Sequence, residues 1–171
     1  TYQGHGTDRA IVAGLMDMGV DDIRIRESLS LAKQAGMHFE FYTIDALRDA
    51  HPNTAVILAR GAGTQVEIQA ASVGGGAIRV ERLEGIRVSF TGENNTLVIT
   101  HTDAPGVIAQ VSSLLAGQGV NIATMQVFRT VPGGDAVMVI ESDELPTRSA
   151  LECLRGLRAV NSVTMLQRLD R

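Results

Sequence analysis

A histidine between two glycines stands near the start of the chain and is the first candidate for chemistry. Residues 4–8 read Gly-His-Gly-Thr-Asp, and an apolar segment at 10–18 follows them. An imidazole at His5 can act as a general base, while the free N–H groups of the following helix start can hold a carboxylate. Thr7 and Asp8 are also good N-caps. The turn is therefore either a base with its caps or a capping turn with an exposed histidine.

Three consecutive glycines, Gly74, Gly75 and Gly76, form a second candidate site. Glycine adopts positive φ easily and leaves the backbone N–H groups open, so this run can form a nest for an anion. No Gly-Lys-Ser/Thr follows, and the next element is a strand, which argues against both a Walker loop and a dinucleotide fingerprint. The alternative is a bulge or a sharp bend between strands.

The third candidate is the turn Asp103-Ala104-Pro105-Gly106. Pro105 suits the first helical turn because its missing N–H would be unpaired there anyway. Gly106 leaves room above the helix N-terminus, where N–H groups and the dipole attract a carboxylate. We expect an amino-acid zwitterion here, with Asp103 on its ammonium group and Asn121 also in contact. Alternatively, Asp103 caps the helix and Gly106 only allows the turn.

The elements around this turn follow the order strand, helix, strand, strand, helix, strand. Apolar residues recur along the first helix with helical spacing, and Gly117 and Gly119 end it. The expected elements are a strand at 97–100, a helix from 107, strands at 121–128 and 136–140 joined by a turn at 132–134, a helix at 150–157 and a strand at 160–169. This order predicts a βαββαβ, ferredoxin-like α+β sandwich.

The first half also has an α+β pattern. We expect helices at 10–18 and 26–35, and an antiparallel sheet of about five strands at 37–42, 55–59, 66–70, 78–80 and 86–90. A short polar linker at 92–95 separates the halves. The predicted domains are residues 1–92 and 96–171.

Composition narrows the classes of function. The chain has 171 residues, 44% of them hydrophobic and 20% charged, with a net charge of −4, which is typical of a globular protein and argues against nucleic acid as a partner. No run approaches the length of a membrane span. Cys153 is the one cysteine, so we expect no disulfide and no metal site in this chain, and a cytoplasmic location. We see no signal peptide, and the start at Thr1 without an initiator Met suggests a longer gene product.

Residues 97–169 resemble an ACT domain, a small regulatory module that binds amino acids. The matching positions are Asp103, Pro105 and Gly106 at the turn, and Gly119, Asn121 and Ile122 before the second strand. The resemblance implies a ligand near this turn and the second strand, between two copies of the module. The implied ligand-binding residues are Asp103, Pro105, Gly106, Val107, Asn121 and Ile122.

The chain as a whole resembles the beta chain of iron–sulfur-dependent L-serine dehydratase. The motifs are Gly-His-Gly-Thr-Asp at 4–8, His-Pro-Asn-Thr at 51–54 and Ser-Val-Gly-Gly-Gly at 72–76, followed by the ACT-like half. The resemblance implies conversion of L-serine to pyruvate and ammonia with a [4Fe–4S] cluster bound by an alpha chain. It places His5, Thr7 and Asp8 where the two chains meet. A family segment of the type Gly-Pro-Ser-Ser-Ser-His-Thr is missing, so we expect no activity from this chain alone.

A second hypothesis is a purely regulatory module, similar to the tail of a 3-phosphoglycerate dehydrogenase. Such a module has no chemical reason to carry the turn at residues 4–8. Under either hypothesis we expect a homodimer through one of the two domains, because helices on one face of the sheet leave its other face or an edge available. Apolar area on two strands is added by Met125, Val127, Met138 and Ile140.

Overall fold

The computed structural model describes residues 4–44 and 50–168 and divides the chain into two compact units, with the division between Arg48 and Asp49. The boundary predicted at 92–96 lies inside the second unit and stays a prediction.

The first unit contains α1 (Thr7–Leu15), a short 3₁₀ helix η1 (Ile23–Glu27) and α2 (Ser28–Gln34). The buried Ser28 joins the helices by donating its hydroxyl to the carbonyl of Arg9 at 2.8 Å. The first helix begins and ends earlier than the predicted 10–18. Gly6 is its N-cap, with a φ of 69°, and the chain turns at Asp17, with a φ of 59°, before it reaches Gly19.

The strand predicted at 37–42 is wrong, because residues 37–44 pair with no other strand in the described part of the chain. The alternating pattern did indicate that two aromatic residues lie on one side. The rings of Phe39 and Phe41 meet edge to face, with centroids 5.9 Å apart. A period of two indicates an extended chain, but it does not supply a neighbouring strand.

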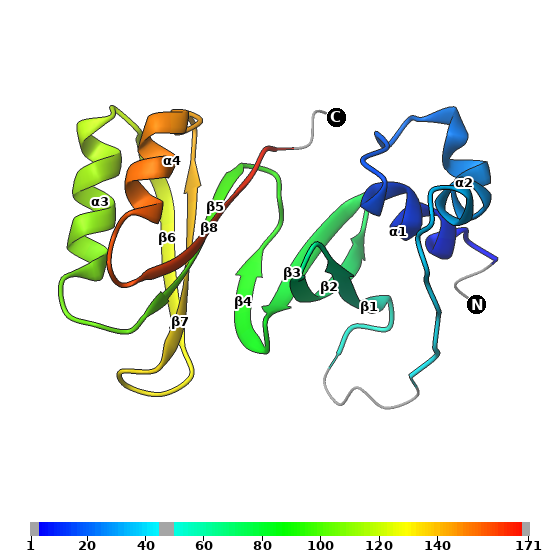
Figure 1. Ribbon diagram of the computed structural model, residues 1–171, viewed down its shortest axis with the longest axis horizontal. Coiled ribbons are helices and arrows are strands. Elements are labelled where there is room, and N and C mark those ends of the chain that lie inside the picture. Colours follow the sequence, from blue (N-terminus) through cyan, green and yellow to red (C-terminus); the bar gives the residue numbers. More distant parts are fainter. Residues whose placement is uncertain (1–3, 45–49, 169–171) are drawn as a thin grey trace. The chain divides into compact units, whose positions relative to one another are not determined.

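The second unit begins with a four-stranded antiparallel sheet in the order β1-β2-β3-β4 (Figure 1). Its strands are β1 (Thr54–Gly61), β2 (Thr64–Gly74), β3 (Ala77–Leu83) and β4 (Ile86–Phe90). These match four of the predicted strands, so the first sheet has four strands where about five were expected. Tight turns with positive φ at Ala62-Gly63 and Glu84-Gly85 close two of its hairpins.

The ferredoxin-like half is confirmed. It consists of β5 (Asn95–Thr102), α3 (Val107–Gly117), β6 (Ile122–Arg129), β7 (Asp135–Ser142), α4 (Arg148–Arg155) and β8 (Val160–Leu166). The strand order is β6-β7-β5-β8, and all neighbours are antiparallel. Helices α3 and α4 cover one face of this sheet (Figure 1). The predicted end of the last strand, at residue 169, lies outside the described residues.

Helix ends in this half follow their local sequence. Gly119, with a φ of 71°, follows α3, and the N–H of Val120 bonds back to the carbonyl of Leu115, as in a Schellman motif. Thr147 caps α4, because its hydroxyl accepts a hydrogen bond from the N–H of Ala150 at 3.1 Å.

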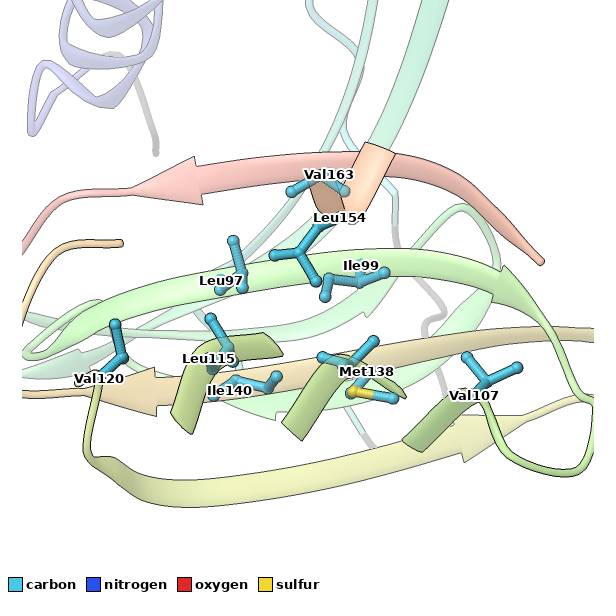
Figure 2. Packing of buried hydrophobic residues seen from close by; sticks show 10 residues of the cluster. Leu97, Ile99, Val107, Leu115, Val120, Met138, Ile140, Leu154 and Val163 are labelled. Atoms are coloured by element: carbon cyan, nitrogen blue, oxygen red, sulfur yellow. The ribbon is translucent and has the colours of Figure 1, made fainter. Parts of the chain in front are cut away.

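The main core lies between the helices and the sheet. Figure 2 shows Leu97 and Ile99 of β5 and Met138 of β7 pointing toward side chains of both helices. Leu115 of α3 and Leu154 of α4 are fully buried there. This core holds the start of α3 rigidly against the sheet, and so positions the turn at 103–106.

The opposite face of the same sheet is covered too. Val98 of β5 and Val137 and Val139 of β7 pack against Val88 and Phe90 of β4. This sheet face is therefore not free to form a dimer, whereas a homodimer through a sheet edge stays a prediction. Met138 and Ile140 lie in the main core, with exposures of 0% and 1%.

Candidate functional site

The turn before α3 has a geometry that only glycine adopts easily. Gly106 is the N-cap of α3, with a φ of 88° and a ψ of −13°. Pro105 therefore precedes the helix. The prediction that Pro105 occupies the first turn of the helix is wrong. A Cβ atom added to Gly106 would meet no atom within 4 Å. Glycine is needed there for its left-handed backbone, and crowding is not the reason.

Asp103 does not cap α3. Its Oδ2 accepts two hydrogen bonds, from Nη1 of Arg129 at 2.9 Å and from the N–H of Gly133 at 3.0 Å. The N–H of Asp103 donates to the carbonyl of Gly134 at 2.8 Å. These bonds tie the turn before α3 to the end of β6 and to the β6–β7 hairpin.

Two open hollows flank this turn. One, of about 350 Å³, is lined by Thr102, Ala104, Pro105, Val107, Gln110, Arg158 and Ala159. The other, of about 500 Å³, is lined by Asp103, Ala104, Pro105, Gly106, Ile108, Arg129 and Gly133. The larger hollow brings an acidic and a basic side chain together beside the helix N-terminus, so it has complementary groups for a small zwitterion.

The bonds to Gly133 and Arg129 lower the pKa of Asp103 below its ordinary value of 3.8. A lowered pKa in the folded state means that the tie stabilises the fold fully above the ordinary value, and that this stability is lost as pH falls through the folded-state pKa. We expect Arg129→Gln to move the pKa of Asp103 back toward 3.8. Titration of the Asp103 carboxyl carbon by NMR measures both values. A wild-type midpoint at or above the ordinary value would contradict the tie.

Asn121 does not join Asp103 within one chain. It lies beyond the C-terminal end of α3, whereas Asp103 lies before the N-terminal end. Its N–H donates to Glu144 at 2.9 Å, and its amide donates to Asp143 at 3.3 Å. The neighbouring Ile122 packs against the main core. Contact of one ligand with both Asp103 and Asn121 thus stays a prediction that requires a second copy.

Val107 borders the smaller hollow, but its side chain is buried in the main core, with an exposure of 3%. Two residues beside the turn were missed by the sequence reasoning. Arg129 lies 26 residues from Asp103, and only its position at the end of an apolar strand could have pointed to it. His101 ends the apolar run of β5 and is 2% exposed.

His101 is an unusual buried polar group. Its Nδ1 lies 2.9 Å from the carbonyl oxygen of Thr102, so Nδ1 carries the proton and donates. Its Nε2 is buried and has no hydrogen-bond partner among the described residues. A buried acceptor without a donor lowers stability.

The turn at residues 4–8 exposes its histidine. His5 and Thr7 are exposed, and Gly6 is the N-cap of α1, without a side-chain cap. Thr7 and Asp8 therefore lie inside the helix, and their predicted capping role is wrong. Asp8 is buried, with its Oδ1 accepting from the N–H of Arg9 at 2.9 Å. In the described residues no hydrogen bond joins His5 to Thr7 or Asp8, so any shared chemistry stays a prediction.

The three glycines at 74–76 form the turn of the β2–β3 hairpin. All three have positive φ, of 97°, 62° and 78°, and Gly74 pairs with Ala77 across the turn. The sharp bend between strands is thus present. Anion binding at this turn remains a prediction, because the geometry of the bend explains the three glycines by itself.

Comparison with known proteins covers both units. A family model for the ACT domain matches residues 95–159. The chain is 34% identical over 158 residues to the L-serine dehydratase beta chain of Peptoniphilus asaccharolyticus, an alignment that covers 92% of this chain and 71% of that protein. It is 36% identical over 166 residues to a probable L-serine dehydratase beta chain of Bacillus subtilis, covering 97% and 75% respectively. The chain belongs to the L-serine dehydratase beta-chain family.

This member of the L-serine dehydratase beta-chain family is also similar in sequence to another enzyme over part of its length. It is 34% identical over 84 residues to D-3-phosphoglycerate dehydrogenase of Methanocaldococcus jannaschii. That alignment covers 49% of this chain and 16% of the dehydrogenase.

The residues of this chain do not fit an iron–sulfur cluster. Such clusters are held by several cysteine thiolates, whereas Cys153 is the one cysteine of the chain and is exposed. Across residues 4–44 and 50–168, no group of three or more His, Cys, Asp or Glu side chains could hold a metal ion. Within the same residues, no helix has the length and apolar character needed to cross a membrane.

Proposed function

We propose that this chain is the beta subunit of an L-serine ammonia-lyase that converts L-serine to pyruvate and ammonia together with an alpha chain. The observation that carries the proposal is alignment with two L-serine dehydratase beta chains across 92% and 97% of this chain. These alignments also cover 71% and 75% of the two beta chains, whereas D-3-phosphoglycerate dehydrogenases that align with up to 93% of this chain are covered to 30% or less.

The alpha chain holds the [4Fe–4S] cluster in this proposal, as the family resemblance implies, and the bound cluster supplies Lewis-acid assistance to departure of the substrate hydroxyl. This chain presents the exposed His5 to the shared site. His5 is exposed, so its imidazole is accessible to a substrate held by the alpha chain and would accept the α-proton of serine. The isolated chain is then inactive, and the enzyme works in the cytoplasm, where a lone thiol stays reduced.

The ACT half supplies amino-acid sensing. The support is a hollow of about 500 Å³ that places Asp103 and Arg129 beside the N-terminus of α3. L-serine or a related amino acid is the proposed ligand, and a homodimer would bring Asn121 of a second copy toward this turn. This sensing lets the level of the substrate amino acid regulate the enzyme.

A purely regulatory module of a serine-pathway dehydrogenase is the alternative. It is favoured by the 34% identity to the Methanocaldococcus jannaschii dehydrogenase over 84 residues. It leaves the exposed His5 turn without a role.

Capture of the bound partner separates the two functions. A tagged form of the chain is expressed in the organism it comes from and purified without oxygen. The protein that co-purifies is identified by mass spectrometry and by its visible absorbance. We expect a protein with cysteine ligands and iron–sulfur absorbance. A nicotinamide-dependent dehydrogenase as the partner would overturn the lyase proposal and support the alternative.

A further inference from the structure

The larger hollow beside the turn before α3 contains a matched pair of opposite charges. Asp103 and Arg129 both line it and are joined by a bond of 2.9 Å. Their side chains are 25% and 55% exposed, so both remain within reach of a small molecule. The N–H of Gly133 also donates a hydrogen bond to Asp103, which helps to hold the carboxylate in place.

The pair leaves polar atoms available on both sides. Both hydrogen bonds to the Asp103 carboxylate use Oδ2, and in the described residues Oδ1 accepts none. Arg129 uses Nη1 for Asp103, and among the described residues its Nε and Nη2 groups donate to nothing. One open acceptor therefore lies beside an open guanidinium edge.

We propose that Arg129 is the residue that recognises the α-carboxylate of the amino acid bound at this turn, while Oδ1 of Asp103 accepts from its α-ammonium group. The inference rests on the proposed amino-acid sensing and adds the residue that would set its requirement for a carboxylate. A guanidinium edge presents two parallel N–H donors, which match the two oxygens of a carboxylate. The Asp103–Arg129 bond survives binding and keeps the two halves of the site in register.

The start of α3 offers a competing way to hold the carboxylate. Free N–H groups at a helix N-terminus attract anions, and Gly106 leaves the space above them open. The two arrangements differ in what a neutral residue at position 129 does. If the helix start holds the carboxylate, removal of the arginine charge leaves the preference for carboxylate-bearing ligands intact.

Isothermal titration of the whole chain with L-serine and with ethanolamine, which is serine without its carboxylate, tests the inference. We expect wild type to bind L-serine about tenfold or more tightly than ethanolamine, in line with charge-assisted hydrogen bonds. Arg129→Gln is expected to abolish that ratio. Arg129→Lys is expected to keep part of it, because the charge remains and the fork is lost. Arg158→Gln, which removes an exposed arginine from the other hollow, serves as the matched control and is expected to leave the ratio unchanged.

The outcomes separate the two proposals. No heat from wild type with any common amino acid would remove amino-acid sensing, and this inference with it. If wild type binds L-serine and Arg129→Gln keeps the same ratio of affinities for L-serine and ethanolamine, only the role of Arg129 is overturned. The carboxylate would then lie at the helix start. Circular dichroism shows whether the variant folds. If it does not, an equal affinity of wild type for L-serine and ethanolamine overturns the inference without any variant.

Discussion

His5→Ala in the assembled two-chain enzyme is expected to lower kcat by about 100-fold or more, the usual scale for losing a positioned acid or base. His5 is exposed at the left-handed turn before α1. The expected loss follows from the proposal that its imidazole accepts the α-proton of serine where the two chains meet. The measurement is anaerobic pyruvate formation at saturating serine.

His38→Ala is the matched control for this prediction, because His38 is also an exposed histidine of the first unit. It should leave kcat unchanged. Both variants should still co-purify with the alpha chain, since a surface imidazole is not needed for folding. Near-normal turnover of His5→Ala in an intact complex would return this turn to a purely structural role.

Gly106→Val is expected to destabilise the ACT half and to abolish L-serine binding. A residue with a Cβ pays about 1–2 kcal/mol in the left-handed region, and β-branching makes that conformation worse. The open space around Gly106 means that the loss arises from the backbone φ of 88° and not from a clash. Thermal unfolding and isothermal titration measure the two effects.

Gly117→Ala in the same helix is the control of opposite sign. Gly117 is the last residue of α3, has an ordinary φ, and faces open space. Alanine there should stabilise the protein by up to about 1 kcal/mol, because glycine costs more conformational entropy. Unchanged stability of Gly106→Val would contradict the left-handed turn on which the candidate site depends.

Local patterns predicted most of the second unit because its strands, apart from β5 and β8, each pair with a strand that is adjacent in sequence. The antiparallel hairpins β1–β2 and β3–β4 are joined by glycine turns that are visible in the sequence. Residues 37–42 show the same alternation but form no strand in the described structure. Periodicity reports the direction of side chains, and strand pairing requires a neighbour that periodicity does not reveal.

The candidate site was harder to predict because its contacts are distant in sequence. The turn before α3 was located from Pro105 and Gly106, whereas the partner of Asp103 comes from the far end of β6. Only the fold of the β6–β7 hairpin brings Arg129 and Gly133 to that carboxylate. The start of α1 was misplaced for a different reason. Gly6 caps the helix by its backbone conformation alone, which gives no side-chain signal.

Anaerobic turnover of L-serine by reconstituted chains tests the central claim most directly. This chain and the alpha chain are expressed separately and together. Pyruvate is then measured for each chain alone and for the complex. We expect pyruvate only from the complex, with this chain and the alpha chain co-eluting. Full activity of the alpha chain alone, with no gain when this chain is added, would contradict the account.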